Sequence, residues 1–401
     1  MSGGVPTTSG VPTTSGAPLL YPAFRALEHA MTMPEVRPLR IFSVRWPLWQ
    51  VEAQARFRES QPFDVVDHFL LRGVVEGRLA TEADLMRFFG LSASLVTRGV
   101  DHLVHIGHLT RTGPAEVAAS SLGVLSVQDG MRYVEKESRH LLYFDAFTNE
   151  PLPRSHYHGS VRILLDGEET AGEHERARWF RRLTSMRPFS LDAVRALGRR
   201  PDRARFNVPH LLEDLSPIAT AGAWLPAHLL LTEDGVLAFT QAAPVRDTFL
   251  EQLCRRAPQV LDTLRHERGG DEPRLRWLDW LRERGLGRAN LHTLPSGVWR
   301  ATLPPQAFDG QLQLHRLGSF QVREGHFLQL WCDDERLRTR AVRQRALAIC
   351  RRPGISRTEA DDAVAAVAQL LDVPVPSFDE LLRLAVESGD LLQRNALEAL
   401  R

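Results

Sequence analysis

Residues 62–124 carry the pattern that most restricts what this 401-residue chain can fold into. From Phe63 onward, apolar residues recur at helical spacing until Gly77 stops the run. Thr81 is placed to cap a short second helix, and Gly90 breaks it. The segment therefore predicts short helices that are separated by tight turns.

A third helix and a hairpin complete this segment. Ser92 or Ser94 can cap a helix that runs to about Ile106, and Gly107 closes it. Residues 109–113 then begin a β-hairpin. Three helices and a hairpin in this order resemble the winged helix-turn-helix domains of bacterial DNA-binding regulators. The resemblance covers about 65 of the 401 residues.

The resemblance implies which side chains would meet DNA. In such domains the third helix enters the major groove with its N-terminal residues, and the wing lies beside it. Serine, threonine and arginine suit contacts with phosphates and with guanine. The implied contact residues are Ser92, Ser94, Thr97 and Arg98 on the helix and Arg111 on the wing.

The helical spacing also predicts the core of this small domain. Residues at i, i+3 and i+4 should face inward. The expected core consists of Val65, Val66, Phe69, Leu70, Leu85, Phe88, Leu95, Val96, Val100 and Leu103.

The charge of the same segment favours a second interpretation. Residues 60–130 hold five arginines and eight carboxylic acids, which leaves a net charge of −3. A protein that binds duplex DNA normally presents a basic surface. Winged helices also serve as protein-interaction and dimerisation modules, so the alternative is a scaffold that does not bind DNA and whose partner is another protein or a second copy of this chain.

Arginine-rich stretches elsewhere could supply positive charge. Lys136 is the only lysine, and the other 49 basic residues are arginines. Residues 172–206 hold ten arginines against four acids, and residues 336–357 hold eight arginines and no acid. One face of a helix there would present phosphate-binding side chains, namely Arg336, Arg340 and Arg343. The alternative is a helix whose arginines are solvated or paired within the protein.

Enzyme chemistry has little support in this sequence. It holds no GxxxxGK[ST], GxSxG or HExxH motif, and its three cysteines are widely spaced. His156 and His158 would share one face of a strand, with Asp145 and Glu150 nearby, so a metal or general-base site is a third hypothesis. A loop is the competing interpretation, because Pro151, Pro153 and Gly159 surround the pair. No cofactor or metal is expected.

The fold class indicated by the pattern is α+β, because strands and helices follow one another without regular βαβ alternation. Asp234 and Gly235 should form a hairpin turn, and residues 312–317 should form a strand. Residues from about 173 to 197 have a helical pattern and should form a helix. The expected divisions are a disordered tail (1–18), an arm (19–61), the winged helix (62–130), an α+β region (131–350) and a C-terminal helical segment (351–401).

The arm contains residues 38–51, which suit an extended or edge strand, because Pro47 argues against a central one. The leading functional prediction is a cytoplasmic bacterial DNA-binding protein. It would act as a regulator or as the DNA-associated subunit of a larger assembly such as a defence system. The chain lacks an apolar run of the ~20 residues that cross a bilayer, and it does not open with a signal pattern.

Overall fold

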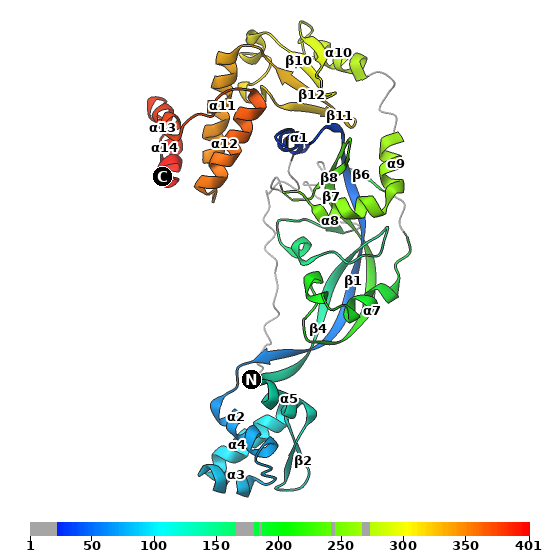
Figure 1. Ribbon diagram of the computed structural model, residues 1–401, viewed down its shortest axis with the longest axis vertical. Coiled ribbons are helices and arrows are strands. Elements are labelled where there is room, and N and C mark those ends of the chain that lie inside the picture. The colour runs from blue at the N-terminus through cyan, green and yellow to red at the C-terminus, as the bar shows by residue number, and fades with distance from the viewer. Residues whose placement is uncertain (1–21, 166–179, 184–186, 242–244, 267–272) are drawn as a thin grey trace, which may run out of the picture.

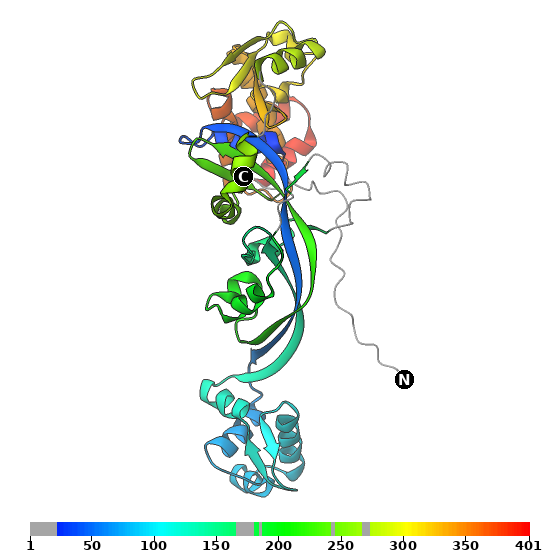
Figure 2. The same ribbon diagram turned by 90° about the vertical axis from the view of Figure 1, so that its right-hand side faces the viewer.

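The structure is a computed structural model that describes residues 22–165, 180–183, 187–241, 245–266 and 273–401. It contains both helices and several sheets, so the α+β expectation is confirmed. The molecule is elongated: a small helical domain lies at one end, and a helix-rich C-terminal part lies at the other (Figures 1 and 2). The expected tail of residues 1–18 lies outside the described residues.

A six-stranded sheet runs along the molecule and joins its two ends. Strands β4, β1, β7 and β5 lie side by side, while β6 pairs with β1 and β8 pairs with β7. The bounds are β1 Pro38–Gln61, β4 Arg132–Asp145, β5 Leu164–Leu165, β6 Arg181–Arg182, β7 Leu212–Thr232 and β8 Gly235–Phe239. The hairpin turn between β7 and β8 lies where Asp234 and Gly235 predicted it.

Strand β1 is central, which corrects the expectation of an arm or edge strand. It pairs with β7 on one side and with β4 on the other. Pro47 is tolerated because β6 pairs only as far as Arg45 and β4 pairing begins at Leu48. Its carbonyl accepts a hydrogen bond from the Ala146 N–H on that side, at 3.1 Å. Since the N and C=O of one strand residue point the same way, the missing N–H falls in the gap in the ladder.

The small domain is inserted between β1 and β4. The two strands pair as far as Gln61 and Arg132, so they form a stalk with the domain at its tip. Its elements are α2 Val65–Val75, α3 Glu82–Phe89, α4 Ala93–His105, β2 Leu109–Arg111, β3 Val117–Ala119 and α5 Ser121–Asp129. Three helices and a two-stranded hairpin therefore form where the sequence predicted them.

Local signals explain the helix ends in this domain. The Thr81 hydroxyl caps α3 by accepting a hydrogen bond from the Asp84 N–H at 3.1 Å. Gly90 ends α3 in the left-handed conformation, with φ of 65°, which costs glycine little. Ser92 is the N-cap residue of α4, although its side chain makes no capping hydrogen bond.

The core of the small domain differs from the expectation at three positions. Leu70, Leu85, Val96, Val100 and Leu103 are fully buried as predicted, and Val66 and Leu95 are partly buried. The expected core residues Val65, Phe69 and Phe88 instead have exposed fractions of 69%, 49% and 68%. Helical spacing could not separate them, because a short helix in a small domain buries a narrower stripe than its apolar face.

Helices cover both faces of the long sheet. Helices α8 Thr248–Arg256 and α9 Pro258–His266 pack on the face that holds Phe42, Val44, Trp46 and Leu48 of β1. On the other face, α7 Leu191–Arg199 packs on Val51, Ala53 and Ala55, and α1 Ala23–Met31 packs on Ile41. A helix was expected over residues 173–197. Among the described residues of that range, 181–182 form β6, and the helical part is the segment of α7 that begins at Leu191. Residues 173–179 lie outside the described residues.

The C-terminal part has one hydrophobic core that runs from Trp277 to Leu397. A second sheet has the strand order β11-β12-β10-β9. The expected border at 350 separates α11 from α12, two helices that share this core. Residues 314–316 form a 3-10 turn, so the strand expected at 312–317 was wrong.

The elements of this part are α10 Pro273–Glu283, β9 Asn290–Thr293, β10 Trp299–Thr302, β11 Phe320–Arg323, β12 His326–Trp331, α11 Glu335–Cys350, α12 Arg357–Leu371, α13 Phe378–Glu387 and α14 Leu391–Ala399. No helix in the described ranges is long and apolar enough to cross a membrane.

Candidate functional site

Helix α4 belongs to the small domain at one end of the molecule (Figure 1). Ser92, Ser94 and Arg98, at the start of this helix, are all exposed. Their polar contacts stay within the helix: the Ser92 and Ser94 hydroxyls lie 3.4 Å apart, and Arg98 Nε donates to the Ser94 carbonyl at 3.2 Å. These three side chains are accessible to a ligand outside the domain.

The other two nominated residues are held by carboxylates. The Thr97 hydroxyl donates to Glu82 at 2.8 Å. Arg111 pairs with Glu82 at 2.9 Å and with Asp101 at 2.5 Å, and these hydrogen bonds raise the pKa of its guanidinium. A phosphate would have to displace these carboxylates to reach Arg111, and it would meet their charge.

Carboxylates also accompany other arginines of the small domain. Arg72 pairs with Glu76 at 2.7 Å, and Arg87 lies 3.9 Å from Asp84. Because these arginines lie beside carboxylates, they do not form a separate basic face. The net charge of residues 60–130 stays negative.

An apolar patch lies on the surface of α2 and α3. We call Val65, Phe69 and Phe88 the tip patch. Val65 and Phe69 are one helical turn apart on α2. Phe69 is linked to Phe88 through the half-buried Phe89, with ring centroids 6.5 Å and 4.9 Å from that ring. Large apolar side chains grouped on a surface are typical of an interaction site.

The arginines of α11 make contacts inside the C-terminal part. Arg343 forms an ion pair with Glu380, and Arg340 lies 3.8 Å from Asp309. Arg338 stacks on Trp331, with its guanidinium 4.8 Å from the ring centroid. Arg336 is exposed at the start of the helix. Two of the three nominated arginines thus already have carboxylate partners.

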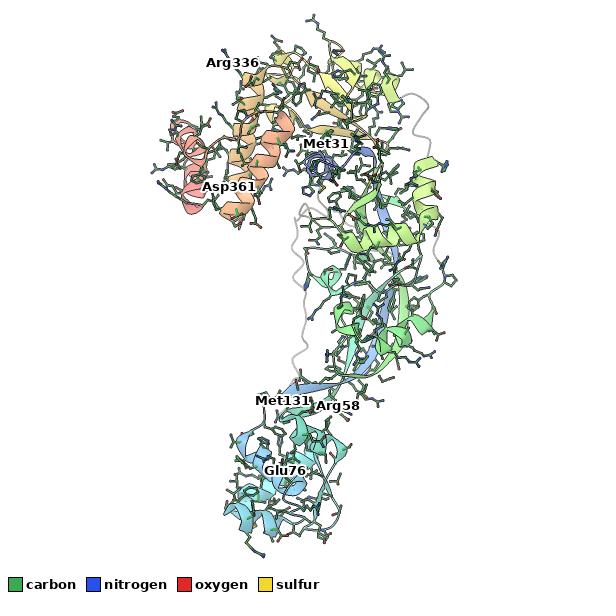
Figure 3. All side chains as sticks on the ribbon, viewed as in Figure 1. Met31, Arg58, Glu76, Met131, Arg336 and Asp361 are labelled. Atoms are coloured by element: carbon green, nitrogen blue, oxygen red, sulfur yellow. The ribbon has the colours of Figure 1, made fainter. Side chains whose placement is uncertain are left out.

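The structure does not bring α11 and the small domain together. Figure 3 labels Arg336 near one end of the molecule and Glu76, which follows α2, at the other. Figure 2 shows the same separation from a second direction. The two sets of candidate DNA-binding residues therefore do not form one surface on a single molecule.

The site expected around His156 and His158 does not form in the structure. His156 is buried, and its Nε2 atom lies 2.7 Å from Asp247. His158 is exposed, and Asp145 instead accepts hydrogen bonds from Trp46 at 2.6 Å and from Thr148. Burial raises the pKa of Asp145 despite those hydrogen bonds. His156 and Asp145 thus contact different partners and do not form a shared site.

Asp247 has a structural role that explains the His156 contact. One of its oxygens caps α8 by accepting from the Leu250 N–H at 2.9 Å. The other oxygen accepts from His156 and from the Thr240 hydroxyl, both at 2.7 Å. Local sequence patterns carry no signal for this contact, because His156 and Asp247 are separated by 91 positions in the chain.

Across the described ranges, no group of three or more histidine, cysteine, aspartate or glutamate side chains is placed to hold a metal ion. Cys254, Cys332 and Cys350 are buried as free thiols.

Comparison of the chain with protein-family models, curated proteins and solved structures finds no match.

Proposed function

We propose that this protein is an adaptor whose small domain binds another protein through the tip patch. The observation that carries the proposal is the exposure of Val65, Phe69 and Phe88, with Val65 and Phe69 one helical turn apart and Phe69 linked to Phe88 through the Phe89 ring. The domain lies at the end of the β1–β4 stalk, away from the other parts of the chain that the structure describes (Figure 1). Burying each of these side chains against a partner would contribute ~1.5–3 kcal/mol.

The charge of the domain favours a basic partner. Asp64 and Asp84 flank the tip patch in sequence, and residues 60–130 carry a net charge of −3. Opposite charges at the rim of an interface favour encounter and orientation. The partner should present an apolar helix face that is bordered by lysines or arginines.

Two helical peptides with the same leucine face test this proposal. One carries lysines on its polar face and the other carries glutamates, and binding to the full chain is followed by fluorescence anisotropy. We expect the lysine peptide to bind and the glutamate peptide to fail. The V65S/F69S/F88S variant should weaken binding by about 100-fold, since such anchors dominate interfaces.

A matched control uses apolar residues that are exposed at the other end of the chain. Leu391 and Leu392 have exposed fractions of 69% and 66% on α14. The L391S/L392S variant should bind the lysine peptide as the wild type does. Equal binding by the V65S/F69S/F88S variant, or no binding of the lysine peptide, would contradict the proposal.

Duplex DNA is the second candidate, in a cytoplasmic bacterial setting. The exposed Ser92, Ser94 and Arg98 at the start of α4 favour it, as does the resemblance to winged helices. A labelled duplex is titrated with the full chain over a salt series. A slope of about −0.9 in log affinity against log salt per neutralised phosphate, with loss of binding in Arg98→Gln, would support DNA in place of a protein partner.

A further inference from the structure

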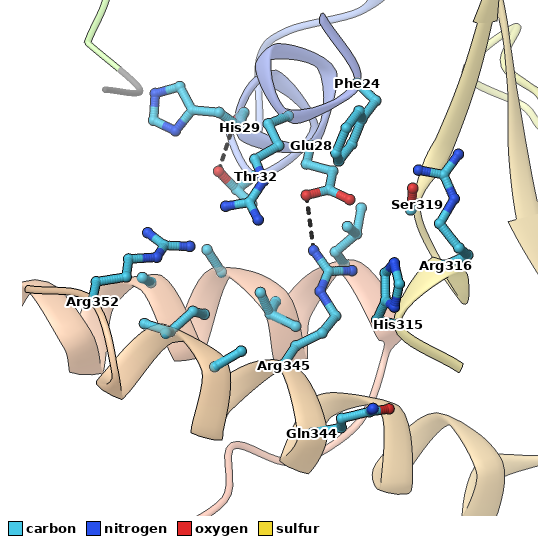
Figure 4. A pocket seen from close by; sticks show the side chains of 17 residues that line it. Phe24, Glu28, His29, Thr32, His315, Arg316, Ser319, Gln344, Arg345 and Arg352 are labelled. Carbon is cyan, nitrogen blue, oxygen red and sulfur yellow. Dashed lines mark hydrogen bonds and ion pairs between the residues drawn. The ribbon is translucent and has the colours of Figure 1, made fainter. Parts of the chain in front are cut away.

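A cavity of about 420 Å³ lies between α1, α11, α12 and the turn that precedes β11. Figure 4 shows side chains from these elements converging on it. Its volume is within the range of about 300–1,000 Å³ that small-molecule sites occupy. It is distant from the tip patch and independent of the function proposed above.

The polar wall of the cavity contains a buried ion pair. Glu28 of α1 and Arg345 of α11 are 2.8 Å apart, and both side chains are mostly buried. Burial raises the pKa of Glu28, although Arg345, Arg25 and Arg316 act against that rise. Three guanidinium groups therefore surround one carboxylate, which leaves an excess of positive charge in a partly desolvated place.

Buried polar atoms in this wall also lack partners. The Ser319 hydroxyl has no hydrogen-bond partner among the described residues, although Ser319 is only 2% exposed. The same holds for one nitrogen of Arg345 and one oxygen of Glu28. Figure 4 shows Ser319 and Arg316 side by side at the cavity, opposite Glu28. Unpaired buried donors cost free energy unless a ligand or water satisfies them.

The opposite wall is aliphatic. Helix α12 contributes Ala363, Ala366, Val367 and Leu370, and α11 contributes Ile349. The two alanines leave room along α12 that a longer side chain would fill. This wall offers dispersion contacts and no hydrogen bonds, so it suits a hydrocarbon body.

We propose that this cavity binds a small organic anion with an aliphatic body. Arg316, Arg25 and the Ser319 hydroxyl hold the acid group, and the hydrocarbon lies along α12. Inorganic anions leave the aliphatic wall uncovered, and a neutral lipid leaves the arginine charges unmatched. The shared ligand chemistry is an alkyl chain that ends in a carboxylate or a phosphate.

Calorimetric titration of the full chain with chosen probes tests the proposal. The probes are decanoate, decyl phosphate, decanol and inorganic phosphate, each below its aggregation concentration. We expect at least one of the two alkyl anions to bind, and the better of them identifies the acid group. Decanol and inorganic phosphate should each bind at least about tenfold more weakly, because each lacks half of the contacts.

Variants assign binding to this cavity. Arg316→Gln removes a charge from the polar wall, and Ala366→Leu fills the aliphatic side; each should weaken binding about tenfold or more. Arg336→Gln removes an exposed charge of α11 outside the cavity and should leave binding unchanged. Thermal melting of the unliganded variants identifies any that fail to fold, and Ala366→Leu tests the cavity without a change of charge.

Three outcomes would overturn the proposal. Equal affinity for decanol and the alkyl anions would mean an apolar crevice without anion recognition. Unchanged binding in both Arg316→Gln and Ala366→Leu would place the ligand elsewhere. Absence of binding by both alkyl anions would exclude this ligand class. None of these results bears on peptide or duplex binding at the small domain.

Discussion

Replacement of Asp247 by alanine should loosen the region around α8 without affecting the ends of the molecule. The buried carboxylate holds three partners: the Leu250 N–H, His156 and Thr240. Loss of a helix cap costs ~1 kcal/mol. Leaving the buried His156 and Thr240 side chains unpaired costs ~1–3 kcal/mol each. The lower part of the resulting range of ~3–7 kcal/mol coincides with the ~3–5 kcal/mol that follows the breaking of a buried pair.

Amide hydrogen exchange measures this effect locally. A loss of ~4 kcal/mol should speed exchange in α8 and in the β7–β8 hairpin by roughly a thousandfold, since ~1.4 kcal/mol corresponds to a factor of ten. Asp247→Asn keeps the cap and should cost ~2 kcal/mol. His158→Ala, at an exposed neighbour of His156, is the control and should change nothing.

The pH dependence follows from the lowered pKa of Asp247. Burial acts to raise this pKa, but the hydrogen bond and charge of His156, with the Leu250 N–H and Thr240, lower it below its ordinary value of 3.8. A depressed folded-state pKa contributes stability that is present above 3.8 and is lost as the pH falls through the folded value. The advantage of wild type over Asp247→Asn should therefore shrink in that acidic range. Exchange that is less than about tenfold faster in Asp247→Ala at pH 7 would refute the reasoning.

Further predictions concern the two ends of the molecule. Gly123→Ala should destabilise the small domain by ~1–3 kcal/mol, because the new Cβ would lie 2.2 Å from a backbone carbonyl oxygen; an unchanged melting temperature would contradict this. Trp277→Ala should cost ~3–5 kcal/mol in urea unfolding, because this side chain is fully buried in the C-terminal core, whereas a cost below ~1 kcal/mol would argue against that packing. The R336Q/R340Q/R343Q variant should keep whatever duplex affinity the small domain has, since α11 lies at the far end; weaker binding in an anisotropy titration would show that α11 takes part.

Local sequence signals predicted the short elements well. The cap at Thr81 and the left-handed Gly90 bound α3 as expected, and Asp234 and Gly235 make the β7–β8 turn. These features depend on interactions within a few residues, which the order of side chains determines directly.

The candidate sites depended on contacts that sequence spacing does not contain. Periodicity placed Val65, Phe69 and Phe88 in the core, but only the packing of α2 against α4 and α5 decided which side of each helix is covered. The arginines of α11 could be counted in the sequence, but their carboxylate partners and their distance from the small domain could not.

The sequence by itself determined where α2, α3 and α4 begin and end, the turn between β7 and β8, and the net charge of the small domain. Tertiary structure decided that β1 is a central strand in spite of Pro47, and it brought Glu28 to Arg345 across 317 positions of the chain. The physical reason is the range of the interactions: capping, turn geometry and helical periodicity act between near neighbours. Strand pairing and buried ion pairs join residues whose meeting depends on how the whole chain packs.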